Sequence, residues 1–233
     1  MHLDRWEAAT ASELLVWALE TYGDSFAIAA SLQKEGMVLV DLASRVSPRV
    51  RVFTLDTGRL PEETYRMMDR VRERYGIAIE AVFPDGGEVE RMVSEHGPNL
   101  FLDSVEQRRL CCEVRKVRPL ERKLKELRAW ATGMRREHAE TRRDIPKVEA
   151  VDGRMKINPL ADWTSVEVDE YVRRHAVPLH PLYARGYASI GCAPCTRPIL
   201  PGEPPRSGRW WWEGEGKKEC GIHFNGDGTA RHA

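Results

Sequence analysis

The stretch Phe26-Ala-Ile-Ala-Ala-Ser31-Leu-Gln-Lys-Glu-Gly36-Met-Val-Leu-Val-Asp-Leu-Ala43 decides the fold class of this chain. Its first residues form a short apolar run that is typical of a buried parallel strand, and the apolar periodicity from Met37 onward predicts a helix. The polar turn between them, residues 31–36, would present backbone N–H groups at a helix N-terminus, an arrangement that suits an anion such as phosphate. Most turns of this kind bind nothing, so the turn alone is weak support for a phosphate site.

More strands of the same kind follow. Arg51-Val-Phe-Thr-Leu-Asp56 and Ile77-Ala-Ile-Glu-Ala-Val-Phe83 are separated by a helix that opens with Pro61, and Ala129-Trp-Ala-Thr132 is a further short strand. Strands that alternate with helices at this spacing predict right-handed crossovers. The sequence therefore predicts an α/β fold with a doubly wound, mostly parallel sheet.

Helices and a hairpin complete the α/β region. Residues 86–96 and 105–127 have helical patterns, the second interrupted at Pro119, and residues 147–157 suggest a small hairpin. Two strand ends carry polar residues, since residues 56–58 follow one strand and the basic run 135–143 follows another. Open α/β sheets bind ligands at the carboxyl ends of their strands, so residues 56–58 stand at the ligand-binding edge. A charge run is usually a solvated loop, but residues 135–143 follow a strand end and can therefore lie over the same ligand face.

The composition excludes several classes of protein. The chain has 233 residues, of which 42% are hydrophobic and 31% charged, enough to bury one sizeable core. Lysine plus arginine and aspartate plus glutamate both total 36, a balance that argues against a nucleic-acid or membrane-surface binder. No run approaches the length of a membrane span, and the first residues resemble neither a signal peptide nor a transit peptide. The sequence therefore predicts a cytoplasmic protein.

The character of the chain changes from Pro178 onward, where proline, glycine and tryptophan are frequent and periodicity is weak. We expect an α/β domain over residues 1–200, followed over residues 201–233 by a lid and a mobile C-terminal segment. The run Arg206-Ser-Gly-Arg209-Trp210-Trp211-Trp212 places two arginines beside three tryptophans, which suggests that the lid binds an anion. Packing is the simpler interpretation for at least one of the tryptophans.

Four of the five cysteines form two close pairs, Cys111-Cys112 and Cys192-Ala-Pro-Cys195. Adjacent cysteines cannot bridge each other without strain, but both can ligate one multinuclear centre. From ligand chemistry alone, four cysteines more often hold structural zinc, yet zinc ligands are usually spaced by two or more residues, which weighs against zinc here. A redox Cys-x-x-Cys is a third interpretation, and it would leave Cys111 and Cys112 without a role.

The fifth cysteine, Cys220, lies in the run Lys217-Lys-Glu-Cys220-Gly-Ile-His223. A lone cysteine is more often a small core residue than a nucleophile. Here the neighbouring lysines and His223 would stabilise a thiolate, and the following glycine leaves its approach open. An odd number of cysteines in a reducing compartment also favours metal ligation and catalysis over disulfides. We therefore predict that Cys220 is a nucleophile.

Four motifs taken together resemble one family: Cys-Cys at residues 111–112, Cys-x-x-Cys at 192–195, Glu-Cys-Gly-Ile-His at 219–223 and Leu-Asp-Thr-Gly at 55–58. The pattern resembles the assimilatory adenylyl-sulfate reductases, within the wider group of phosphoadenylyl-sulfate reductases and PP-loop-like nucleotide-binding proteins. The resemblance runs from about residue 31 to His223. It implies a PP-loop type nucleotide-binding domain over residues 1–200 and a [4Fe-4S] cluster held by Cys111, Cys112, Cys192 and Cys195.

The resemblance also implies a substrate and a reaction. The family acts on adenosine 5′-phosphosulfate in sulfate assimilation, and Cys220 would displace AMP to form an S-sulfocysteine. A thioredoxin or glutaredoxin-like thiol would then release sulfite. By family position, Ser31 and the turn after it would bind the nucleotide, with Gly133 on the adenosine side. The residues that would hold the phosphosulfate are Lys116, Arg142, Arg206, Arg209 and His223.

Two loops depart from the family pattern. Residues 33–36 read Gln-Lys-Glu-Gly where Gly-Ala-Glu-Asp is common, and Glu137-His138-Ala139 stands where a Gln-Ser pair is frequent. Lys34 and Arg143 leave the use of a 3′-phosphorylated substrate open. The sequence also leaves open whether the protein forms a homo-oligomer.

Two other functions fit part of the sequence. A PP-loop ATP-dependent sulfurtransferase would share the fold, but it would require a Ser-Gly-Gly-x-Asp-Ser type of loop, which this chain lacks. An iron–sulfur nucleotide-binding regulator would not need Cys220. AMP release that depends on adenosine 5′-phosphosulfate separates the reductase from both alternatives.

Overall fold

A computed structural model describes residues 3–138 and 142–213 of the chain. The described residues divide into two compact units that are interleaved along the sequence. The first unit comprises the described residues of Met1–Thr54, Arg66–Glu80 and Leu124–His180, and the second comprises those of Leu55–Tyr65, Ala81–Lys123 and Pro181–Ala233. Cys220, His223 and most of the segment 201–233 lie outside the described residues, so the predicted division near residue 200 stays a prediction.

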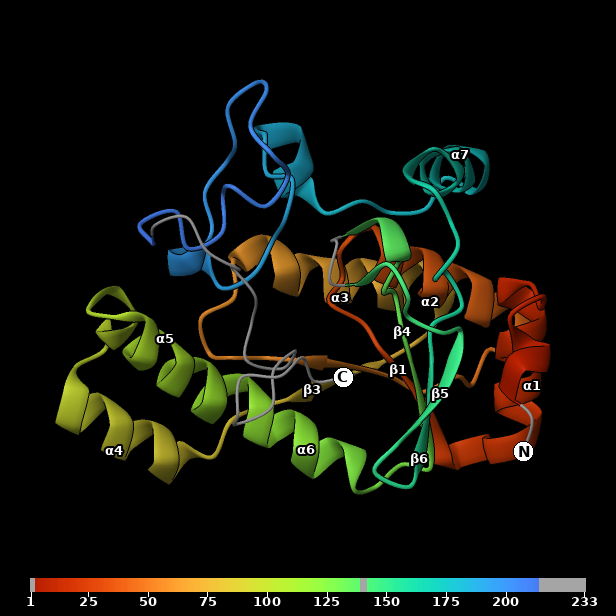
Figure 1. Ribbon diagram of the computed structural model, residues 1–233, viewed down its shortest axis with the longest axis horizontal. Helices are drawn as coiled ribbons and strands as arrows, with labels where there is room; N and C mark the ends of the chain where they lie inside the picture. Colours follow the sequence, from red (N-terminus) through yellow and green to blue (C-terminus); the bar gives the residue numbers. More distant parts are fainter. Residues whose placement is uncertain (1–2, 139–141, 214–233) are drawn as a thin grey trace. The chain divides into compact units, whose positions relative to one another are not determined.

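A six-stranded sheet has the strand order β3-β2-β1-β4-β6-β5 (Figure 1). Strand β1 pairs in parallel with β2 and β4, β4 pairs in parallel with β6, and β5 runs antiparallel to β6. The predicted doubly wound, mostly parallel sheet is confirmed. The predicted hairpin is also confirmed, and it is formed by β5 and β6. The strand order reverses between β1 and β4, which is where open sheets of this type bind ligands. The strands are β1 Phe26–Ala29, β2 Val52–Leu55, β3 Ile79–Val82, β4 Ala129–Thr132, β5 Val148–Val151 and β6 Arg154–Ile157.

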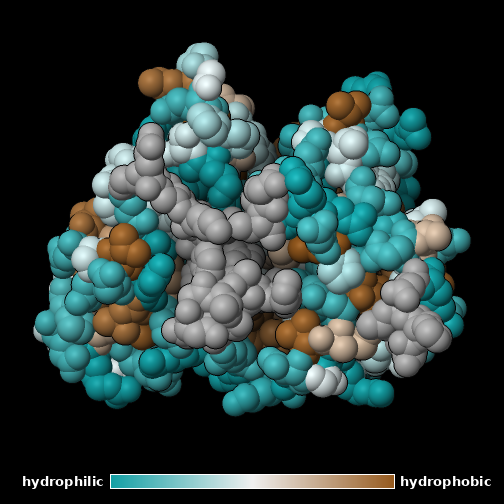
Figure 2. All heavy atoms as spheres, viewed as in Figure 1, coloured by the Kyte–Doolittle hydropathy of each residue, from teal (hydrophilic) through white to brown (hydrophobic). Residues whose placement is uncertain are grey.

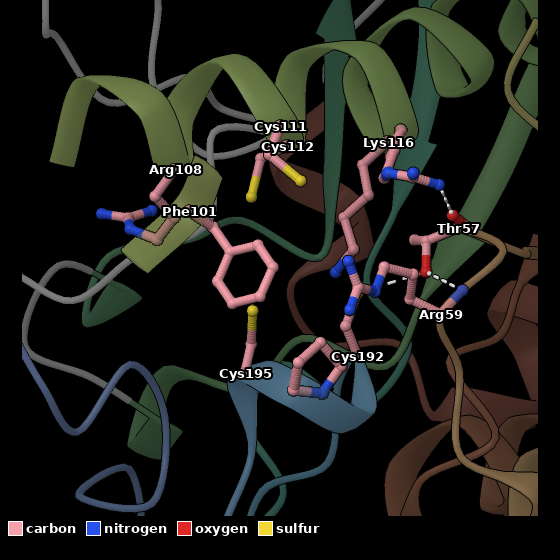
Figure 3. A pocket seen from close by; sticks show the side chains of 11 residues that line it. Thr57, Arg59, Phe101, Arg108, Cys111, Cys112, Lys116, Cys192 and Cys195 are labelled. Atoms are coloured by element: carbon pink, nitrogen blue, oxygen red, sulfur yellow. Dashed lines mark hydrogen bonds between the residues drawn. The ribbon is translucent and has the colours of Figure 1, made fainter. Parts of the chain in front are cut away.

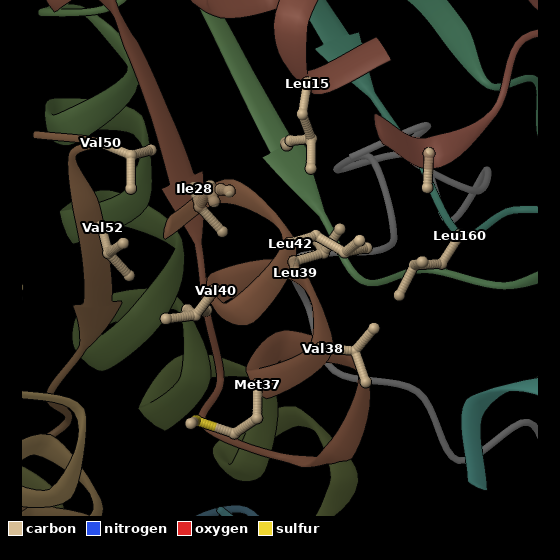
Figure 4. Packing of buried hydrophobic residues seen from close by; sticks show 14 of the residues in the cluster. Leu15, Ile28, Met37, Val38, Leu39, Val40, Leu42, Val50, Val52 and Leu160 are labelled. Atoms are coloured by element: carbon tan, nitrogen blue, oxygen red, sulfur yellow. The ribbon is translucent and has the colours of Figure 1, made fainter. Parts of the chain in front are cut away.

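The core of the first unit is built around α2 (Lys34–Val46), which packs against α1 (Ala11–Tyr22) and α7 (Ser165–His175). Every residue of α2 from Gly36 to Ala43 is buried, which explains why this stretch is apolar on more than one face. Figure 4 shows its side chains beside those of Leu15 on α1 and Ile28 on β1. Capping boxes begin both neighbouring helices, at Thr10 for α1 and at Thr164 for α7.

The second unit contains α4 (Gly86–His96), α5 (Val105–Cys112), most of α6 (Arg118–Leu124) and a loop-rich region after Pro181, while α3 (Glu62–Tyr75) begins in the second unit and ends in the first. Between α5 and α6 the backbone is π-helical over Glu113–Val117. The sequence predicted an interruption at Pro119, and the observed one lies just before it. Proline has no N–H and its ring would clash with the carbonyl of Arg115 in a regular α-helix, so the widened turn accommodates it.

Hydrophilic side chains cover most of the face shown in Figure 2, and apolar residues form small separate patches there. This surface agrees with the high and balanced content of charged residues. Among the helices of the described residues, none combines the length and the apolar character that crossing a bilayer requires.

Candidate functional site

Four free cysteines of the second unit line one pocket. Figure 3 shows Cys111 and Cys112 extending from α5, and Cys195 extending toward them from the short helix Ala193–Cys195. The structure therefore brings together two cysteine pairs that lie far apart in the sequence. The other residues that line this small pocket are Thr57, Arg59, Phe101, Arg108, Arg115, Lys116 and Pro194.

Helix α5 presents the first cysteine pair. Ser104 caps the helix, since its side chain accepts a hydrogen bond from the backbone N–H of Gln107 at 3.2 Å. Cys111 and Cys112 occupy the last turn, where Cys111 is buried and Cys112 is partly exposed. The π-helical turn follows Cys112 directly, and turns of this kind occur frequently at functional sites.

A tightly bonded loop presents the second pair. The carbonyl of Cys192 accepts hydrogen bonds from the backbone N–H of Cys195 at 3.0 Å and from the hydroxyl of Thr196 at 2.9 Å. The buried Arg209 donates from Nε to the carbonyl of Cys195 at 3.3 Å. Its guanidinium lies so close to the backbone of Gly191 that a Cβ there would sit 2.2 Å from Nη2. A Cβ at position 191 would therefore force the Arg209 guanidinium to shift from this position.

Thr57, from the Leu-Asp-Thr-Gly motif, contacts a cysteine sulfur directly. Its Oγ1 lies 3.2 Å from Sγ of Cys192 and also accepts a hydrogen bond from the backbone N–H of Arg59 at 3.3 Å. A hydroxyl has one proton to donate, and a deprotonated Cys192 could only accept it. The sequence placed Thr57 at the end of a strand, but it did not predict this contact, because residues 57 and 192 share no local pattern.

Burial raises the pKa of two of these thiols, and neighbouring charges oppose that rise or add to it. Burial raises the pKa of Cys111, and the nearby guanidinium of Arg115 opposes that rise. Burial raises the pKa of Cys195 to about 12, and the neighbouring Cys192 adds to the effect. A metal centre must displace these protons to bind, as in any thiolate site. The cationic side chains that line the same pocket, and that would offset thiolate charge, are Arg59, Arg108, Arg115 and Lys116.

Within residues 3–138 and 142–213, no group of three or more His, Cys, Asp or Glu side chains is arranged to hold a metal ion. A mononuclear zinc site would place four sulfurs at about 2.3 Å from one ion. Beside the cysteines, the fully buried Trp210 packs with Cys111 and Cys195, and its Nε1 has no hydrogen-bond partner in the described part of the chain.

In the first unit, the turn after β1 and the exit of β4 lie against each other. Helix α2 begins after Gln33, whose side chain makes no capping hydrogen bond. Ser31 is exposed in this turn. A Cβ at Gly133 would lie 2.9 Å from Cβ of Glu35 and 3.1 Å from the backbone N of Gly36. Only glycine lets the two segments approach this closely.

The two departures from the family pattern meet at Glu35. Its Oε1 lies 2.9 Å from Nε2 of His138 and 3.1 Å from Nη2 of the buried Arg135. Burial by itself would raise the pKa of Glu35, but the hydrogen bond and charge of His138, together with Arg135, outweigh burial and lower it to about 2. Glu35 is therefore a carboxylate near neutral pH, and it ties the start of α2 to the segment after β4.

The remaining predicted substrate residues lie in different parts of the chain. Arg142 belongs to the first unit, whereas Lys116, Arg206 and Arg209 belong to the second. Lys116 lines the cysteine pocket, and the carbonyl of Arg206 accepts a hydrogen bond from the N–H of Arg209 at 3.0 Å. Cys220 and His223 lie outside the described residues. The roles of all these residues stay predictions.

Residues 25–198 match the model of the phosphoadenosine phosphosulfate reductase domain. The chain is 50% identical over 203 residues to the adenosine 5′-phosphosulfate reductase of Burkholderia cepacia, an alignment that covers 86% of this chain and 81% of the relative. Among solved structures, phosphoadenylyl-sulfate reductase from Candida auris in a phosphate complex superposes with a TM-score of 0.70 at 28% identity, over 82% of this chain and 94% of that one. FMN adenylyltransferase of Candida glabrata, in a complex with FAD and pyrophosphate, shares the fold at 15% identity with a TM-score of 0.58, over 94% of this chain and 74% of that one.

Proposed function

Because this chain belongs to the phosphoadenosine phosphosulfate reductase family, as its motifs predicted, we propose that it reduces adenosine 5′-phosphosulfate to sulfite and AMP in sulfate assimilation. The observation that carries the proposal is the meeting of Cys111, Cys112, Cys192 and Cys195 in one pocket that Lys116 also lines. The relative from Burkholderia cepacia bears the name of this activity at 50% identity. A cytoplasmic location accords with the use of free thiols in a reducing compartment.

We propose that the four thiols hold a [4Fe-4S] cluster rather than a single zinc ion. A cubane takes one thiolate on each of four irons, so the sulfurs need not converge on one point. The hydroxyl of Thr57 is a donor beside these sulfurs. Trp210 belongs to the same buried cluster, and its Nε1, which has no hydrogen-bond partner among the described residues, would be satisfied by a thiolate or sulfide acceptor within its reach. When bound, the cluster supplies a linkage between α5 and the loop 191–196 and a fixed charge beside Lys116.

The protein's own residues would then perform the sulfur chemistry. The Cys220 thiolate attacks the sulfate sulfur, a new S–S bond forms, and the bond from that sulfur to the phosphate oxygen breaks, so that AMP leaves with the bonding pair. The product is an S-sulfocysteine. A reductant thiolate attacks Sγ of Cys220, sulfite leaves, and a second thiol of the reductant resolves the mixed disulfide. The two thiols of the reductant supply the two electrons and become a disulfide, and Cys220 is regenerated as a thiol, as expected for a thioredoxin or glutaredoxin-like dithiol.

Cationic side chains would hold the anionic substrate. Lys116 lies beside the cysteines, and we assign it to the sulfate, where positive charge offsets the charge that shifts to the leaving oxygen. The start of α2, after Ser31, suits a phosphate through its backbone N–H groups. Gly133 would lie on the adenosine side of that turn. Arg142, Arg206, Arg209 and His223 complete the proposed set.

We propose that the protein prefers the substrate without a 3′-phosphate. Lys34 is one of the two residues for which the sequence left the use of a 3′-phosphorylated substrate open. It donates a hydrogen bond to Asp169 at 2.6 Å. Its charge is thus already compensated by a carboxylate. The curated relative is also named for the substrate without the additional phosphate.

Anaerobically purified protein should contain iron and inorganic sulfide, and it should form sulfite and AMP in equal amounts from adenosine 5′-phosphosulfate and reduced thioredoxin. A sulfurtransferase would require ATP instead, and a regulator would bind the nucleotide without releasing AMP. Stoichiometric zinc in a colourless protein would contradict the cluster, and the absence of sulfite with an intact cluster would contradict the activity.

A further inference from the structure

The side chain of Asn158, at the carboxyl end of β6, bridges two segments of the first unit. Asn158 is fully buried. Its Oδ1 accepts a hydrogen bond from the hydroxyl of Thr132 at 2.7 Å, and its Nδ2 donates to the carbonyl of Pro146 at 2.9 Å. Thr132 is the last residue of β4, and Pro146 lies in the segment that leads into β5. One buried amide, satisfied on both sides, therefore joins the end of β4 to the entry of β5.

The segment that leads into β5 is held at three consecutive carbonyl groups. The carbonyl of Ile145 accepts a hydrogen bond from Nε of Arg136 at 3.0 Å. Asn158 holds the next two carbonyls, that of Pro146 through its side chain and that of Lys147 through its backbone N–H at 2.7 Å. A substitution at position 158 therefore changes the bond to Pro146 and leaves the backbone bond in place.

Both bridged segments carry residues that we assign to the substrate. Thr132 is followed directly by Gly133, which we place on the adenosine side. The turn before Pro146 begins at Arg142, whose carbonyl accepts a hydrogen bond from the N–H of Ile145 at 3.1 Å. The bridge through Asn158 therefore connects the segment of Gly133 to the segment of Arg142.

We propose that Asn158 is a positioning residue that fixes the segments of Gly133 and Arg142 relative to each other and so sets the affinity for the anionic substrate. A site whose binding groups are ordered beforehand binds more tightly, because less order has to be imposed when the ligand arrives. Asn158 is not a catalytic residue, since its side chain is fully buried and bonds to the protein's own groups. This inference rests on the proposed function, and it deepens that function by naming a residue that sets substrate affinity.

Asn158→Asp tests the bridge through its pH dependence. Aspartate has the same shape and keeps an acceptor for Thr132, but a carboxylate has no proton to donate to the carbonyl of Pro146. At about pH 8, Asn158→Asp should bind adenosine 5′-phosphosulfate about tenfold or more weakly than wild type, because a buried carbonyl loses its donor. Burial raises the pKa of a carboxyl group, so the neutral acid should form and donate again as the pH falls toward about 5. The affinity relative to wild type at the same pH should then recover, and a ratio that does not change with pH would overturn the proposal.

A kinetic measurement separates positioning from a loss of folded protein. At saturating substrate, the single-turnover rate of AMP release by Asn158→Asp should stay within about threefold of wild type, because the residues that perform the chemistry are unchanged. Tyr171→Phe is the matched control, since it removes a hydrogen bond of 2.7 Å to the buried Asp41 in the same unit. It should lower stability and leave the affinity unchanged. If Asn158→Asp also lowers stability while binding the substrate as wild type does at about pH 8, the bridge is only structural and the proposal is wrong.

Hydrogen exchange gives a measurement that does not depend on activity. The amide of Ile145 should exchange several-fold faster in Asn158→Asp than in wild type or in Tyr171→Phe, because the turn is released more often. Unchanged exchange would overturn the proposal. If wild type neither binds nor converts adenosine 5′-phosphosulfate, the proposed function fails, and the exchange comparison still tests whether Asn158 orders the turn.

The other bond of the bridge provides a second variant if Asn158→Asp folds poorly. Thr132→Val removes the donor to Oδ1 of Asn158, and Thr132→Ser keeps it. Weaker substrate binding in Thr132→Val, with recovery in Thr132→Ser, supports the proposal. Wild-type affinity in both variants overturns it.

Discussion

The hydroxyl oxygen of Thr57 lies 3.2 Å from the sulfur of Cys192, so the Leu-Asp-Thr-Gly motif is part of the cysteine pocket. The motif's own residues shape this contact. Asp56 accepts hydrogen bonds from the backbone N–H of Gly58 at 2.8 Å and from the hydroxyl of Tyr65 at 3.2 Å, which fixes the turn that presents Thr57. A strand end that the sequence marked only as part of the ligand-binding edge therefore contacts a cysteine that we propose as a cluster ligand.

Replacing Thr57 by valine should weaken the bound cluster without unfolding the protein. Valine has a similar shape but no donor, and a hydrogen bond to a charged acceptor contributes about 1.5–3 kcal/mol. The measurement is the rate at which visible absorbance is lost to a chelator under anaerobic conditions, which should increase in Thr57→Val. Thr57→Ser keeps the hydroxyl and should retain the wild-type rate; equal rates in all three proteins would remove Thr57 from the support of the site.

Replacing Trp210 by phenylalanine should change the stability of the cluster-free protein and that of the cluster-loaded protein in different directions. Without a cluster, the buried Nε1 of Trp210 has no partner in the described part of the chain, so removing it should be neutral or stabilising. With the cluster bound, the same change should destabilise by about 1–3 kcal/mol if Nε1 donates to a thiolate or sulfide sulfur, as we propose. Thermal unfolding of the protein with and without the cluster measures both changes in stability. The same shift in both states would show that Trp210 donates nothing to the centre.

Lys116→Ala should slow sulfonation far more than it weakens substrate binding. Removing a preorganised donor that stabilises developing charge costs about 2.7–4 kcal/mol, or roughly a hundredfold to a thousandfold in rate. Single-turnover AMP release gives the rate, and equilibrium binding gives the affinity. Lys125→Ala, which changes an exposed lysine, is the control. An unchanged rate of AMP release in Lys116→Ala would leave Lys116 with a structural role only.

The carboxylate of Glu35 should make stability depend on pH in an acidic window. Its pKa falls from an ordinary 4.5 to about 2 in the folded protein, so its stabilisation is complete above pH 4.5 and is lost as the pH falls toward 2. A shift of this size corresponds to about 3 kcal/mol. Glu35→Gln should therefore lower the free energy of unfolding near neutral pH, and the difference from wild type should shrink below pH 4.5.

Glu203 provides the control for this prediction. Its pKa is also lowered to about 2, by its hydrogen bonds with Arg197 and with the backbone of Leu200, but solvent screens the exposed pair. Glu203→Gln should therefore change stability much less than Glu35→Gln at neutral pH. A difference between Glu35→Gln and wild type that does not vary between pH 7 and pH 2 would contradict the proposed charge state of Glu35.

The sequence predicted the elements that depend on local patterns. Apolar runs gave β1, β2, β3 and β4, and the Asp152-Gly153 turn gave the β5–β6 hairpin, because strand burial and turn chemistry are encoded within a few residues. The sequence could not show that Thr57 meets Cys192, or that Arg108 pairs with Glu213, because these contacts join residues separated by 135 and 105 positions. Topology, rather than periodicity, brings such residues together. The π-helical turn before Pro119 was likewise missed, since proline marks a break without specifying its geometry.

The central claim is that Cys220 takes up the sulfo group before any electron arrives, and peptide mass mapping after one turnover tests it most directly. Wild-type protein given adenosine 5′-phosphosulfate without a thiol reductant should release one AMP per chain and carry one sulfo group on Cys220. Cys220→Ser should keep the iron content and the substrate affinity but release no AMP. An unmodified Cys220 in wild-type protein that nevertheless forms sulfite when thioredoxin is added would contradict the covalent route.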